Sequence, residues 1–92
     1  MAVGLRLDLA SNAGAGNGTA KEWPGGTGFF MAEATWGGGS VKLQYQTPQG
    51  TWVDVASSTL SANGALKLDV PPGQVRAAIA TSTAVYAHFV RI

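Results

Sequence analysis

Residues 40–70 read SVKLQYQTPQGTWVDVASSTLSANGALKLDV, and this stretch decides the fold class. From position 41 to position 45 every second residue is apolar, which is the period of a strand with one face on a core and the other in water. The sequence TPQG follows at 47–50, where proline and glycine suit the corners of a hairpin turn. The apolar alternation resumes at 53–55. We therefore predict an antiparallel hairpin here.

A second hairpin is predicted at Asn63-Gly64, the dipeptide most typical of two-residue turns. The apolar residues Leu66, Leu68 and Val70 alternate with polar ones after it. Two hairpins within one short stretch predict an antiparallel sheet. The sheet is the scaffold, and it carries no catalytic constellation.

Further strands are predicted on both sides of this stretch, over 3–9, 19–23, 27–36, 75–79 and 84–92. Glycine, proline and serine clusters separate them, and no segment of ten or more residues has the helical period of 3.6. The pattern predicts an all-β protein with little or no helix. About seven or eight short strands of this spacing are typical of an antiparallel β-sandwich, jelly-roll-like in type.

The chain has 92 residues, which predicts a single domain over 1–92. Residues 10–18 are small and rich in glycine, and we expect them to form a flexible loop. Their glycines do not have the spacing of a phosphate-binding loop. Only 12% of the residues are charged, about half the usual share, so we expect part of the surface to be covered in an assembly.

Composition also excludes several classes of function. The chain has no cysteine and a net charge of +1, so we expect neither disulfides nor binding to nucleic acid or to an anionic membrane. No apolar run approaches the length of a membrane-spanning helix. The N-terminal residues do not resemble a signal peptide, and we expect the chain to fold in a cytoplasm.

Residues that carry catalysis or hold metal ions are scarce. His88 is the one histidine, and one imidazole does not build a metal site. The carboxylates Asp8, Asp54 and Asp69 fall on polar faces of predicted strands, where cross-strand pairing explains them. We therefore predict no catalytic residue, no metal site and no cofactor, and we expect that the protein is not an enzyme.

Two predicted strands are apolar on both faces, the strands at 27–36 and 84–92. A face that the core of one molecule does not cover is expected to meet another polypeptide. Of the three tryptophans, Trp36 is expected in the core. Trp23 and Trp52 are expected at loop edges or subunit contacts, and stacking on a sugar ring stays open for both. The residues that we predict at an interface are Phe29, Met31, Trp52, Tyr86, His88 and Val90.

The second half of the chain, residues 40–92, carries a resemblance to a known group of proteins. Its phrases LQYQ and GTWVDV at 43–55 and PPGQVR at 71–76 resemble small virion proteins of tailed bacteriophages, of the capsid decoration (cement) or head-fibre type. The resemblance implies a sandwich or jelly roll that binds the outer capsid surface and stabilises the head.

The same resemblance implies partners and a location. The partners would be the major capsid protein and further copies of the chain, with a homotrimer favoured, and the place would be the capsid surface of a virion assembled in a bacterial cytoplasm. The alternative is a carbohydrate-binding or host-attachment module, a fibre or tail component that uses an exposed tryptophan.

Overall fold

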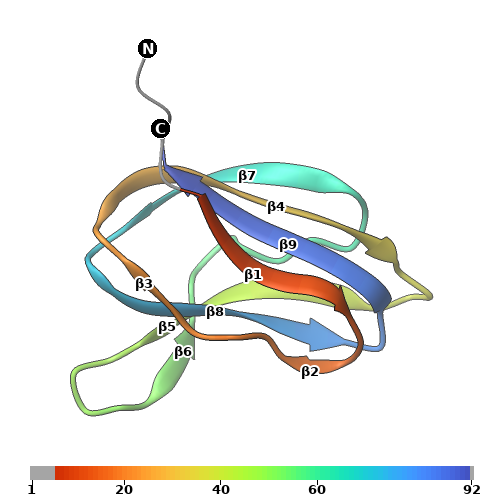
Figure 1. Ribbon diagram of the computed structural model, residues 1–92, viewed down its shortest axis with the longest axis horizontal. Coiled ribbons are helices and arrows are strands. Elements are labelled where there is room, and N and C mark those ends of the chain that lie inside the picture. The colour runs from red at the N-terminus through yellow and green to blue at the C-terminus, as the bar shows by residue number, and fades with distance from the viewer. Residues whose placement is uncertain (1–5, 92) are drawn as a thin grey trace.

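Two antiparallel sheets pack face to face in the computed structural model, which describes residues 6–91 (Figure 1). The described residues contain no helix. The strands are β1 (Arg6–Ala13), β2 (Gly16–Asn17), β3 (Lys21–Trp23), β4 (Gly26–Thr35), β5 (Ser40–Gln46), β6 (Trp52–Asp54), β7 (Gly64–Val70), β8 (Gly73–Ala80) and β9 (Thr83–Arg91). The predicted fold class, an all-β antiparallel sandwich, is confirmed.

Each sheet is built from strands that are distant in the sequence. The four-stranded sheet has the order β1-β9-β4-β7, and the five-stranded sheet has the order β2-β8-β5-β6, with β3 also paired to β8. From β3 onward the chain crosses between the two sheets at almost every connection. Since each crossing places an inward apolar face against the other sheet, the core is assembled from non-local contacts.

The hairpin predicted around TPQG is confirmed. The strands β5 and β6 pair with Tyr45 opposite Val53. The Gly50 N–H donates to the Thr47 carbonyl over 2.8 Å, and Gly50 has a φ of 90°, which glycine adopts without steric cost. Val53 was expected on the core side, but it is 42% exposed because β6 is a three-residue strand at the edge of its sheet.

The hairpin predicted at Asn63-Gly64 is wrong. The strand β7 pairs with β4, from Gly26 opposite Val70 to Ala32 opposite Gly64, so it lies in the other sheet. Neither Asn63 nor Gly64 has the positive φ that a type I′ turn requires. The segment before it covers the free edge of β5 instead, where Leu60 and Val41 exchange two backbone hydrogen bonds of 2.7 and 2.8 Å.

Residues 10–18, expected to form a loop, contain the end of β1 and the short strand β2. The pairing of β1 with β9 shifts register after Asp8, and this bulge leaves both Leu9 and Ala10 buried. The link between β2 and β3 is tight, since a Cβ on Gly18 would lie 2.3 Å from the Leu9 carbonyl oxygen. The first part of the strand predicted at 3–9 lies outside the described residues.

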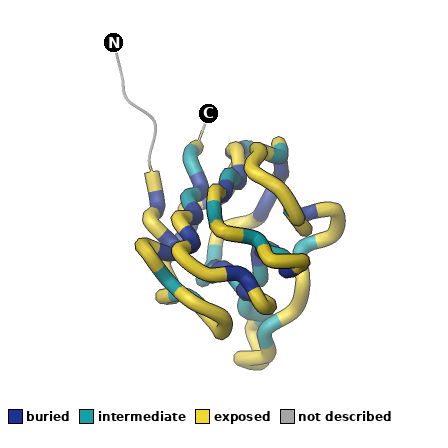
Figure 2. The backbone as a smooth tube through the Cα atoms, turned by 90° about the vertical axis from the view of Figure 1, so that its right-hand side faces the viewer, coloured by how far each residue is buried: buried dark blue, intermediate teal, exposed yellow. Residues whose placement is uncertain are grey.

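The core lies between the two sheets, and buried residues alternate with exposed ones along the strands (Figure 2). Inward residues of β1, β4, β7 and β9 meet those of β3, β5 and β8. The buried apolar residues are Leu7, Leu9, Ala10, Trp23, Phe30, Ala32, Val41, Leu43, Leu68, Val70, Val75, Ala77, Ile79, Val85, Ala87 and Phe89. The inward faces predicted for β5, β7, β8 and β9 are therefore confirmed.

Candidate interaction surface

The outward side of the four-stranded sheet gathers five of the six residues predicted at an interface. Phe29 and Met31 project from β4, and Tyr86, His88 and Val90 project from β9, each alternating with buried residues of the same strand. We call the outward side chains of β1, β9, β4 and β7 the outer face. Period-two alternation brought these residues to one side, as the sequence indicated.

The strand register arranges the outer face in rows across the sheet. Val90 lies opposite Phe29, His88 opposite Met31, and Tyr86 opposite Glu33. Side chains directly opposite on neighbouring antiparallel strands are about 5 Å apart at Cβ, so each row is in contact across the strands. The central two strands therefore present a continuous, mostly apolar strip.

The outer face is not covered by the described part of the chain. Phe29 is 40% exposed and Tyr86 is 39% exposed, while Met31, His88 and Val90 are half-buried. Phe29, Tyr86 and Val53 are the exposed large hydrophobic residues of the region from 6 to 91. Two of these three thus lie on one face, with the row of Met31 and His88 between them.

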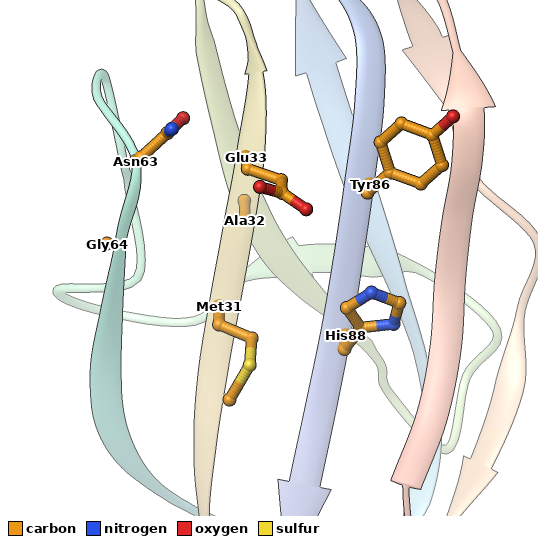
Figure 3. Close-up of a pocket in the computed structure, with 7 residues that line it drawn as sticks. All are labelled: Met31, Ala32, Glu33, Asn63, Gly64, Tyr86 and His88. Carbon is orange, nitrogen blue, oxygen red and sulfur yellow. The ribbon is translucent and has the colours of Figure 1, made fainter.

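A shallow groove of about 300 Å³ opens on this face at one end of the sheet. Met31, Tyr86 and His88 form its apolar and aromatic side, with Glu33 between the strands and Asn63 across from it on the side of β7 (Figure 3). The groove exists because the pairing of β4 with β7 ends at Ala32 and Gly64. Asn63 was not predicted in any surface site. The residues that line the groove with it come from β4 and β9, which are distant from it in the sequence, so no local pattern reveals this contact.

Charged groups flank the apolar strip. The Asp8 carboxylate lies 2.8 Å from His88 Nδ1 and 3.1 Å from Arg6 Nε. On the far side, Lys67 of β7 lies opposite Phe29. Neither Glu33 nor Lys67 belongs to an ion pair formed within residues 6–91.

The outward side of the five-stranded sheet has a different character. The Asp54 carboxylate accepts hydrogen bonds from Lys42 Nζ and Gln44 Nε2, each of 2.9 Å. Arg76 Nε donates to Gln44 Oε1 over 2.8 Å. The hydrogen bond from Gln44, and then that from Lys42, holds the pKa of Asp54 below its ordinary value. These polar groups satisfy one another within a single chain.

Two of the three tryptophans, Trp23 and Trp36, occupy other positions than predicted. Trp23 is fully buried, and its Nε1 donates to the Val70 carbonyl over 2.9 Å, so it is neither a loop-edge contact nor a sugar platform. Trp36, expected in the core, is half-buried and donates through Nε1 to Asn63 Oδ1. Trp52 lies on the five-stranded sheet, far from the other predicted interface residues, with the Arg76 guanidinium 4.2 Å above its ring.

The predicted carboxylates are found where cross-strand pairing was expected. Asp8, Asp54 and Asp69 are exposed, and Asp69 is hydrogen-bonded to Thr27. In the region that the structure describes, no three metal-binding side chains come together. That region also has no helix long and apolar enough to cross a bilayer. The chain matches no family model, no curated protein and no solved structure.

Proposed function

We propose that this chain is a structural virion protein that binds the outer surface of a capsid, together with further copies of itself, and stabilises the head. The observation that carries the proposal is the contrast between the two sheet surfaces. One surface holds a satisfied network around Asp54, whereas the other exposes Phe29 and Tyr86. An exposed apolar strip of this kind is typical of a protein that adheres to another polypeptide.

The virion setting is supported by the resemblance of residues 40–92 to decoration and head-fibre proteins. Burying one large apolar side chain contributes roughly 1.5–3 kcal/mol. A few such side chains per subunit, repeated over a shell, add avidity without new contacts at any one site.

We also propose that the sandwich is a jelly roll. Support comes from the strand order, in which β1 lies beside β9 and β4 beside β7. If β2 and β3 are counted as one interrupted strand paired to β8, each sheet has four strands. Neighbours from distant parts of the chain are what Greek-key connections produce.

Carbohydrate binding through an exposed tryptophan is less well supported. Trp23 is buried, and the ring of Trp52 already carries Arg76 on one face. If Trp52 did hold a sugar, glycan binding lost in Trp52→Ala would reveal it, while binding to capsids would be unchanged.

The proposal is tested by sedimenting the purified chain with empty heads of the phage whose genome encodes it. We expect the wild type to sediment with the heads, to saturate them and to raise the temperature at which they open. Phe29→Ser should weaken this binding. Val53→Ser is the matched control, because Val53 has almost the same exposure on the other sheet. A chain that neither binds the heads nor changes their stability contradicts the proposal.

A further inference from the structure

We infer that the outer face is the contact between two copies of this chain related by a two-fold axis, with Lys67 of each copy entering the groove of the other and pairing with Glu33. The inference deepens the proposed function, because it rests on the adhesive role of this face and names a second copy as its partner. It does not depend on the identity of the capsid.

The first step is the position of the two charges on the face. Lys67 lies on β7 in the row of Phe29, while Glu33 lies on β4 four residues beyond Phe29, in the row of Tyr86. Along a strand four residues span about 13 Å. The two charges therefore stand on opposite sides of the row of Met31, which is halfway between them, and Asp69 lies one row beyond Lys67, hydrogen-bonded to Thr27.

The second step is the symmetry operation that brings Lys67 of one copy beside Glu33 of the other. A two-fold axis that lies between the two faces, at right angles to the strands and along the row of Met31, exchanges the row of Glu33 with that of Phe29. Tyr86 of one copy then lies over Val90 of the other. Lys67 reaches the end of the groove lined by Asn63, beside Glu33. The operation forms this ion pair twice, as an isologous contact requires.

The other simple arrangement is disfavoured by charge. An axis parallel to the strands would place β7 of one copy over β1 of the other. Arg6 lies on β1 in the same row as Lys67, through Val90 and Phe29. Lys67 would then face a second cation, Arg6, which Asp8 of its own chain already pairs, and Glu33 would have no cation opposite it. Like charges directly opposed suppress a pairing mode.

The remaining charges of the face tolerate the favoured arrangement. Asp8 lies in the row of Met31, at the edge of the sheet, and therefore approaches its own copy across the axis. Each Asp8 already holds Arg6 and His88 within its own chain. These contacts offset the repulsion between the two carboxylates.

The available area fits a weak dimer. Four strands spaced about 4.8 Å apart, with a central strand of ten residues, give a footprint of roughly 500 Å² per copy. The total of about 1,000 Å² is near the lower limit for a specific interface. We therefore expect a dissociation constant in the micromolar range, which paired charges can shift strongly.

The experiment is a charge exchange, read as the dissociation constant of the purified chain in sedimentation equilibrium without heads. We expect Glu33→Lys and Lys67→Glu each to weaken the dimer by about tenfold or more. The double variant, and an equimolar mixture of the two single variants, should both restore association to within about threefold, because each recreates two opposite-charge pairs. Glu22→Lys, an exposed reversal on β3, is the control and should change nothing.

Several outcomes overturn the inference. The inference is wrong if the wild type is monomeric or trimeric. It is also wrong if the single variants dimerise as tightly as the wild type, or if the double variant does not regain the dissociation constant of the wild type. If a reversed charge prevents folding, Glu33→Gln and Lys67→Met replace the pair, and each must still weaken the dimer. A monomer that binds heads through Phe29 would assign the face to a capsid subunit, leaving the proposed function intact. A dimer that does not bind heads would support the inference and contradict the proposed function.

Discussion

Trp23 lies against Phe89 with their ring centroids 3.9 Å apart and their planes 15° apart. Trp23 comes from β3 in the five-stranded sheet and Phe89 from β9 in the four-stranded sheet, so this stack joins the two layers. The buried indole N–H is satisfied by the Val70 carbonyl, as a buried tryptophan requires. The stack thus unites three strands that are far apart in the sequence.

Room for this stack depends on Gly28. A Cβ at this position would lie 2.8 Å from both Trp23 Cη2 and Phe89 Cε1, and 2.7 Å from the Val90 carbonyl oxygen. We expect Gly28→Ala to lower the free energy of unfolding by about 1–3 kcal/mol, because a packed core resists an added methyl group. Urea unfolding measures the change. Gly14→Ala is the control, since nothing lies within 4 Å of its Cβ; equal effects at the two positions would contradict the prediction.

Ser58 takes the place of a strand partner at the edge of β5. Its buried Oγ accepts from the Leu43 N–H over 3.1 Å and donates to the Val55 carbonyl over 2.6 Å. Ser58→Ala leaves a buried backbone donor without a partner, so we expect a loss of about 1–3 kcal/mol in unfolding free energy. The exposed Ser61→Ala should have little effect in the same urea titration. Faster amide hydrogen exchange at Leu43 alone would localise the change, and its absence would count against this role.

The Asp54 network makes part of the stability depend on pH. Its pKa in the folded chain lies below the ordinary value of 3.8, through Gln44 first and Lys42 second. A depressed carboxyl pKa stabilises the fold above the unfolded value, and this contribution is lost as the pH falls through the folded value. Asp54→Asn should therefore be less stable than the wild type near neutral pH, with a gap that closes as the pH falls through the folded value. A gap in urea midpoints that persists unchanged in acid would show that charge is not its cause.

What the sequence predicted well is local. Apolar residues at every second position place one face of a strand on the core whatever its partner is. The inward sides of β5 and β8 therefore followed from the alternation alone. For β4 and β9, which are apolar on both faces, the alternation gave which residues share a face, and so grouped Phe29 with Met31 and Tyr86 with Val90. The turn at 47–50 was also predicted correctly, because its proline and glycine determine the backbone locally.

What the sequence did not predict is non-local. Trp23 follows Lys21 and Glu22 in a three-residue strand, which is too short to show a period. Its burial comes from Gly28 and Phe89, which are distant in the sequence and could not be predicted as its neighbours. Strand partners were also missed where the chain crosses between sheets. The groove beside Glu33 was hidden for this reason, because it forms only when β7 lies against β4.

Asn63 allows a direct test of a contact between distant strands, because the sequence predicted a local turn at this position. Its side-chain oxygen accepts from Trp36 Nε1 over 2.8 Å and from the Ala34 N–H over 3.2 Å, which ties the start of β7 to the end of β4. We expect Asn63→Ala to lower the free energy of unfolding by about 1–2 kcal/mol, because two hydrogen bonds are lost. Asn63→Asp keeps an acceptor oxygen for both hydrogen bonds and should retain most of the stability. The indole N–H resonance of Trp36 should shift in Asn63→Ala and stay close to its native position in Asn63→Asp. If Asn63 acted instead as a turn residue, Asn63→Gly would be tolerated best of the three, and that ranking in urea midpoints would overturn this assignment.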